Sequence, residues 1–179
     1  MKRFLFTVLA AVICLTLPVG AQTSLKDALI KHWQRSADLT IAVADAMPAA
    51  DYGFRPNPAE MSFGQLMAHI AVADMSACGA VRGEKLDLPP KIAEWAKDQD
   101  KVAIDKATAM PLLKDAFASC QKTLSAITPE ILEQTIGTGE RAQTRFELLW
   151  SYFTHTAHHR GQAEVYLRLK DIKPPTYVF

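Results

Sequence analysis

Three of the five histidines in this 179-residue chain fall within five residues, at His155, His158 and His159. On an α-helix, at about 100° per residue, His155 and His159 lie one above the other on a single face that also carries Tyr152 and Tyr166, and His158 lies at its edge. Two imidazoles with this spacing can converge on one metal ion. Burying neighbouring imidazoles is costly unless their lone pairs are bound, so the spacing favours a metal site and a hydrogen-bonded core pair about equally.

A third ligand must come from another segment, and His69 is the first candidate. Its predicted helix face carries small side chains, which predict a pocket beside the imidazole: Ala73, Ser76, Ala77 and Ala80. Gln65, one turn earlier, is a candidate for lining that pocket or for a hydrogen bond to a ligand. His32 is the rival, because it is central on the apolar stripe of the first predicted helix. If the two helices are antiparallel neighbours, His32 and His69 lie near opposite ends of the bundle, which favours His69.

Other metal chemistries lack their motifs in this sequence. No Glu follows His155 in a zincin pattern, no Glu-x-x-His pair serves a di-iron bundle, and no Cys-x-x-Cys-His attaches haem. A mononuclear three-histidine site with an open position remains, and its ligands suit Zn²⁺, Ni²⁺, Cu²⁺ or Fe²⁺ without choosing among them. Tyr152, Gln162 and Tyr166 are candidates for lining the pocket or orienting a substrate, although tyrosines on this face are equally suited to core packing. Asp74 lies about 140° around the helix from His69, so no carboxylate stands out as a general base, which counts against a hydrolase.

The elements that must position these residues form an all-α protein, a four-helix bundle with one long crossover connection. Helical periodicity and end signals predict long helices over 24–47, 62–83, 109–127 and 144–170, with capping boxes at Ser62 and Thr144. A connection of about 24 residues follows Gly83 and contains a short amphipathic helix, 92–99, anchored by Trp95. Its length allows the second and third long helices to run parallel. A short helical turn is expected at Thr128, and residues 174–179 form an extended tail.

Residues 1–21 have the pattern of a secretory signal peptide, with Lys2 and Arg3 before an apolar run and small residues at its end. An uncleaved membrane anchor is the alternative, but the run is short for a span. The expected mature domain is 22–179, periplasmic or secreted, with no membrane contact after cleavage. Outside the cytoplasm Cys78 and Cys120 form either one disulfide or two buried thiols.

Charge argues against one class of partner. Lys and Arg total 20 against 19 Asp and Glu, a formal net charge of +1, so there is no basic surplus to bind nucleic acid. A small molecule is the expected partner.

Two blocks of sequence resemble the DinB/YfiT-like four-helix proteins, the DinB superfamily. One is His155-Thr-Ala-His-His-Arg-Gly-Gln162, which continues to Tyr166-Leu-Arg and Pro174-Pro175; the other is Ser62-Phe-Gly-Gln-Leu-Met-Ala-His69, preceded by Tyr52-Gly-Phe-Arg-Pro. The resemblance implies a divalent metal held by His69, His155 and His159. It also implies that dimers are common, so a homodimer is expected. Some members are thiol S-transferases that use bacillithiol or mycothiol, and others are isomerases.

The sequence therefore favours a divalent-metal-dependent enzyme acting on a small molecule, by thiol transfer or hydrolysis. The alternatives are a non-catalytic bundle that binds metal for stability, storage or stress response, and a metal-free scaffold.

Overall fold

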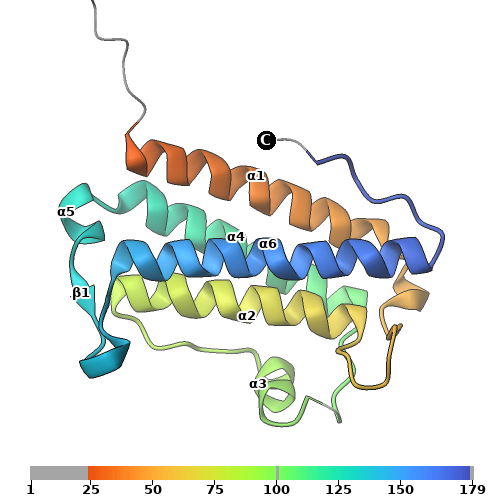
Figure 1. Cartoon of the computed structure of the whole chain (residues 1–179). Coiled ribbons are helices and arrows are strands. Elements are labelled where there is room, and N and C mark those ends of the chain that lie inside the picture. Colours follow the sequence, from red (N-terminus) through yellow and green to blue (C-terminus); the bar gives the residue numbers. More distant parts are fainter. Residues whose placement is uncertain (1–23, 100, 178–179) are drawn as a thin grey trace, which may run out of the picture.

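Four long helices form the body of the protein in the computed structural model, which describes residues 24–99 and 101–177 (Figure 1). They are α1 (Leu25–Ala46), α2 (Phe63–Arg82), α4 (Lys106–Ala126) and α6 (Arg145–Leu169). The smaller elements are η1 (Ala49–Asp51), α3 (Pro90–Lys97), α5 (Pro129–Leu132), η2 (Gly139–Arg141), and the antiparallel pair β1 (Thr135–Ile136) and β2 (Gln143–Thr144). The predicted four-helix bundle is confirmed. The predicted signal peptide, residues 1–21, lies outside the described residues.

Contacts at the helix ends define the topology. Lys106 at the start of α4 donates to the carbonyls of Asp45 and Met47, where α1 ends, so these two helices are antiparallel. Arg145 at the start of α6 donates to the carbonyl of Val81 near the end of α2, so this pair is antiparallel too. α1 and α2 each pack against α4 and α6 and are therefore diagonal in the bundle.

α2 and α4 run parallel, as the long connection predicts. Cys78 and Cys120, at similar depths in the two helices, are joined by a disulfide, and both side chains are fully buried. The chain after Gly83 returns along the bundle through α3, which lies beside α2 in Figure 1, and Trp95 of α3 is only 1% exposed. The predicted crossover and its tryptophan anchor are confirmed.

The helix ends follow local capping signals. Ser62 and Gln65 form a capping box on α2, and Thr144 and Glu147 form another on α6, so both helices begin where the sequence predicts. Gly83 ends α2 in the left-handed conformation, with φ 73°.

Two helices begin earlier than predicted. α4 begins at Lys106 rather than Ala109, because the Asp105 side chain accepts a hydrogen bond from the backbone N–H of Thr108 and caps the helix there. Pro111 is consequently inside the helix, on its exposed side, where it removes one backbone hydrogen bond. α3 begins at Pro90 rather than residue 92, because a proline fits the first helical position.

The core-facing side of α6 differs from the prediction. Its buried residues are Leu148, Leu149, Thr156, Arg160, Ala163, Tyr166 and Leu167. Their directions average about 45° around the helix from His159 and about 85° from His155, so the histidines lie toward the rim of the buried face rather than at its centre. The rim position leaves them half-buried and close to solvent. In the described part of the chain, no helix combines the length and apolar character needed to cross a membrane.

Candidate metal centre

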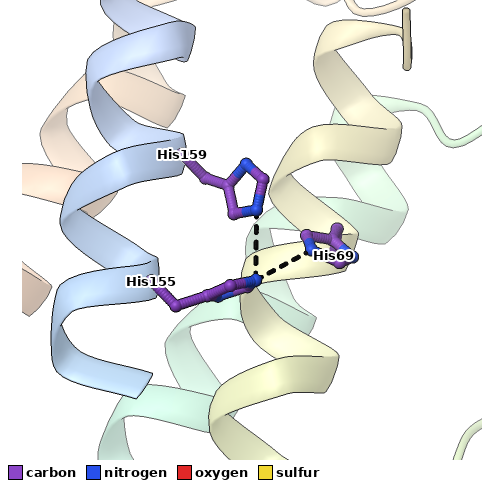
Figure 2. Close-up of side chains that lie close together, drawn as sticks. All are labelled: His69, His155 and His159. Carbon is purple, nitrogen blue, oxygen red and sulfur yellow. Dashed lines mark hydrogen bonds between the residues drawn. The ribbon is translucent and has the colours of Figure 1, made fainter. Parts of the chain in front are cut away.

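His69 from α2 meets His155 and His159 from α6 where these antiparallel helices pack together (Figure 2). The Nε2 atom of His155 lies 3.1 Å from Nε2 of His69 and 3.1 Å from Nε2 of His159. Each ring offers one nitrogen atom as a ligand, and these three nitrogens all lie within 4.8 Å of one another. The structure thus brings together the three residues that the sequence predicts as ligands.

The close nitrogens cannot all be explained by hydrogen bonds. An imidazole Nε2 has one in-plane site, which holds either a proton or a lone pair. The Nε2 atom of His155 faces two nitrogens at 3.1 Å and can hydrogen-bond to only one of them. Three nitrogens at about 2.0–2.1 Å from a tetrahedral ion are separated from one another by roughly 3.4 Å. The observed spacing fits that arrangement, so this group could hold a metal ion.

The local environment keeps the three imidazoles neutral. Burial, together with smaller contributions from the neighbouring His159 and His155, lowers the pKa of His69 to about 4. Burial also lowers the pKa of His155 and His159, with smaller contributions from charges on neighbouring histidines. Because only a neutral imidazole offers a lone pair, the group is ready to bind a cation at neutral pH.

Gln162 orients one of the ligands. Nδ1 of His159 lies 2.7 Å from Oε1 of Gln162, and donation of its proton to that oxygen leaves Nε2 with a lone pair directed into the cluster. The side-chain amide nitrogen of Gln162 is 3.3 Å from Nε2 of the exposed His158 and can donate to it. His158 is thus outside the cluster, at the edge predicted for it. Nδ1 of His155 is buried and has no partner among the described residues.

A cavity of about 400 Å³ lies directly beside the cluster. Its lining includes the His69 and His155 rings, the apolar residues Val72, Ala73 and Leu86, and the hydroxyl-bearing residues Ser76, Ser151 and Tyr152. The ring of Tyr152 is 5.8 Å from that of His155. A larger cavity, about 610 Å³, lies where α2 and α4 end, and no histidine lines it.

Two other predicted pocket residues have partners elsewhere. Gln65 accepts hydrogen bonds from Arg55 and from the backbone of Ser62, and it donates to the carbonyls of Gln99 and Val102. It therefore ties the crossover to the start of α2, a role consistent with its place in the capping box.

Tyr166 donates its hydroxyl proton to the carbonyl of Met61 at 3.0 Å and packs edge-on against Phe54. Like Gln65, it does not line the cavity beside the histidines.

His32, the rival candidate ligand, is not placed as the sequence predicts. His32 is exposed rather than central on a buried stripe, and it lines a narrow groove with Phe153 and Ala157 of α6. That is the same stretch of α6 that carries His155, so the two helices do not place His32 and His69 at opposite ends. His32 and His69 face different sides of α6 instead. Ala157, which lines the groove with His32, lies about 160° around α6 from each of His155 and His159.

Two buried polar groups were not predicted from the sequence. The carboxyl of Asp74 is fully buried, with Oδ1 accepting a hydrogen bond from Thr156 at 3.0 Å and Oδ2 without a partner in the described structure. Burial raises its pKa to about 8. Arg160 donates to the hydroxyl of Ser36 at 2.8 Å across the α1–α6 interface. One signal in the sequence could have indicated their burial: Asp74 on α2 and Arg160 on α6 each share a helix face with buried apolar residues.

Fold and site define the class of protein: a four-helix bundle with a crossover and a three-histidine group suited to a metal ion. The sequence signature of the DinB superfamily matches residues 32–163, and the chain belongs to that family. The resemblance seen in the sequence motifs is therefore confirmed.

Solved structures show the same fold. A DinB-like protein from Bacillus subtilis is 20% identical, with a TM-score of 0.65, and the match covers 84% of this chain and 97% of that one. A DinB-like protein from Bacillus cereus is 18% identical, with a TM-score of 0.69 and coverage of 86% and 97%. A variant of a mycothiol-dependent maleylpyruvate isomerase is 12% identical, with a TM-score of 0.61, covering 76% of this chain and 59% of that one. No curated protein sequence matches this chain.

Proposed function

We propose that this protein is a divalent-metal-dependent enzyme that acts on a small molecule in the cavity beside His69 and His155. His69, His155 and His159 would hold one ion. The observation that carries the proposal is the convergence of three neutral imidazoles, two of which line a cavity of about 400 Å³. Three protein ligands leave a tetrahedral ion one position for water or substrate, which is the arrangement of catalytic rather than structural sites.

Thiol transfer is the reaction best supported. A bound divalent ion lowers the pKa of a coordinated thiol or water and so supplies a nucleophile at neutral pH. Hydrolysis would also need a group to accept a proton from water, and no carboxylate lines the cavity. Asp74, the acidic residue of α2, is hydrogen-bonded to Thr156 in the interior instead. The similar fold of a mycothiol-dependent isomerase supports thiol chemistry on this scaffold.

The chain's own residues would orient the substrate. Ser76, Ser151 and Tyr152 bring three hydroxyl groups to the cavity wall, each able to donate or accept a hydrogen bond. Gln162 would keep His159 in the tautomer that presents Nε2 to the ion.

We also propose that residues 1–21 are removed as a signal peptide and that the mature protein works in the periplasm or outside the cell. The Cys78–Cys120 disulfide supports this, because such bonds persist in oxidising compartments. The mass of the mature protein recovered from the periplasm of a bacterial host tests it. A chain that begins near Gln22 supports the proposal, and one that retains Met1 contradicts it.

Metal analysis tests the enzyme proposal most directly. Protein purified without an affinity tag should contain about one divalent ion per chain, and His69→Ala should lose it while its thermal midpoint changes little. His158→Ala is the matched control, because this exposed neighbour lies outside the cluster and its variant should keep the ion. Wild-type protein without metal would refute the proposal, and joint loss of metal and fold in His69→Ala would indicate a structural site instead.

A further inference from the structure

A second cavity, of about 610 Å³, lies where α2 and α4 end and α6 begins (Figure 1). Its volume falls within the range of roughly 300–1,000 Å³ typical of ligand pockets. Val81, in its wall, lies about 18 Å along α2 from His69, so this cavity is separate from the histidine cluster. We propose that it is a further binding site, which takes an organic carboxylate with an apolar body. The proposal does not rest on the proposed metal-dependent activity.

Positive charge is concentrated in the wall of this cavity. Three cationic side chains and one carboxylate line it: Arg82, Lys122, Arg145 and Glu84. They give the wall a formal charge of +2, against +1 for the whole chain. The pKa of Glu84 is lowered, first by its hydrogen bond from Arg82 and further by the charges of Arg82 and Lys122. The cations therefore already stabilise one carboxylate here, and their surplus favours a second.

Arg145 offers the geometry that a carboxylate needs. Its Nη1 atom donates to the carbonyl of Val81, and its buried Nε atom has no partner among the described residues. The edge of a guanidinium group that carries Nε and Nη2 can donate two parallel hydrogen bonds to one carboxylate. A buried donor without a partner is costly, so a ligand that accepts from Nε would relieve that cost.

Two helices end at this cavity, and the partial negative charge of a helix end would oppose an anion. Hydrogen bonds compensate much of that charge. Arg145 donates to the carbonyl of Val81 at the end of α2, and Lys26 donates to that of Ser125 at the end of α4. The backbone N–H of Gly83 donates to further carbonyls of α2. The side-chain cations therefore dominate the potential in the cavity.

The rest of the wall favours an organic ligand over an inorganic ion. Val81 and Ile127 line the cavity and are each only 3% exposed, and Ile131 of α5 lines it as well. An apolar group placed against these side chains is removed from water, which stabilises the complex in proportion to the area covered. A phosphate or sulfate ion would leave this part of the wall unused.

Three probes separate the role of charge from that of apolar contact: 4-phenylbutyrate, its neutral amide, and acetate, which has the charge without the ring. Each is titrated into the purified protein in a calorimeter at low ionic strength, where exposed charges are screened least. We expect 4-phenylbutyrate to bind roughly ten-fold more tightly than the amide, because its carboxylate gains charge-assisted hydrogen bonds. Acetate should bind much more weakly than 4-phenylbutyrate, since it covers none of the apolar wall.

Two variants change the charge of the wall in opposite directions. Lys122→Glu should weaken the binding of 4-phenylbutyrate about five-fold, and Glu84→Gln should strengthen it about three-fold because the competing carboxylate is gone. Both side chains are exposed, so the thermal midpoints should change little. Lys114→Glu is the matched control. Lys114 is an exposed lysine of the same helix, it does not line the cavity, and its replacement changes the net charge equally.

Several results would overturn the proposal. One is the absence of 4-phenylbutyrate binding to the wild-type protein, and another is equal affinity for the acid and its amide. Equal weakening by Lys122→Glu and Lys114→Glu would show an effect of net charge rather than of this cavity. Binding that disappears in His69→Ala would place the carboxylate at the histidine cluster instead. Binding that persists in His69→Ala and responds to Lys122→Glu and Glu84→Gln as expected supports the second site.

Discussion

Replacement of the buried acid Asp74 by asparagine should stabilise the protein at neutral and alkaline pH. The carboxyl is fully buried, accepts one hydrogen bond from Thr156, and has a second oxygen without a partner in the described structure. Asparagine has nearly the same shape and keeps an oxygen for the Thr156 hydroxyl, but it carries no charge at any pH.

The magnitude follows from the pKa. Burial raises the pKa of Asp74 from 3.8 to about 8, so the folded protein holds this proton more tightly than the unfolded chain does. The contribution of Asp74 to stability is therefore fully present below about pH 4 and is lost as the pH rises toward 8. One pKa unit corresponds to about 1.4 kcal/mol, so the loss across this window is on the order of 5 kcal/mol. The new amide brings an N–H₂ group without a partner, which subtracts roughly 1–3 kcal/mol at every pH.

Urea unfolding of wild-type protein and Asp74→Asn at pH 4.5, 6 and 7.5, in the presence of a chelator, measures the effect. The difference in unfolding free energy should move in favour of the variant by several kcal/mol between the lowest and highest pH. Comparing the variant with wild-type protein at each pH removes the contribution of the three clustered histidines, which both proteins share. Their lowered pKa values act in the opposite direction and make stability fall as the pH falls. A difference that stays constant across this range would refute the reasoning.

Four further variants test the fold and the site. Replacing Cys78 and Cys120 by alanine opens a link spanning 42 residues and should cost about 4 kcal/mol of unfolding free energy on chain-entropy grounds, measured by denaturation of both forms. Gly64→Ala would drive a methyl group into the Ile104 carbonyl and should lower the thermal midpoint sharply, whereas Gly161→Ala, with open space around it, should raise stability by about 0.5–1 kcal/mol. Gln162→Leu should weaken metal binding roughly ten-fold or more with little change in stability, as competition with a chelating dye would show.

The positions of most helix ends could be predicted because their signals are local. Two helix starts are each predicted by a capping box that spans four residues. The structure forms both boxes, Ser62 with Gln65 and Thr144 with Glu147. The crossover followed from the length of chain after Gly83. α4 begins three residues earlier than the apolar pattern predicts, because its cap, Asp105, lies outside that pattern.

The buried face of α6 could not be predicted from apolar periodicity. Thr156 and Arg160 occupy it, and each is buried only because a partner on another helix, Asp74 or Ser36, accepts its proton. The disulfide likewise depends on how one helix packs against another. Two cysteines permit a bond, but their pairing requires α2 and α4 to run parallel and in register, with the two Cα atoms 5.3 Å apart.

The histidine cluster shows how contacts outside a site determine it. The spacing of His155 and His159 is visible in the sequence, but His69 joins them only in one register of α2 against α6. That register is held at one end by Arg145 on the Val81 carbonyl and at the other by Tyr166 on the Met61 carbonyl. A shift of one helical turn, about 5.4 Å, would exceed the 3.1 Å that separates Nε2 of His69 from that of His155 and would break the cluster. Tyr166, predicted as a pocket residue, thus contributes to the site by fixing this register rather than by touching a ligand.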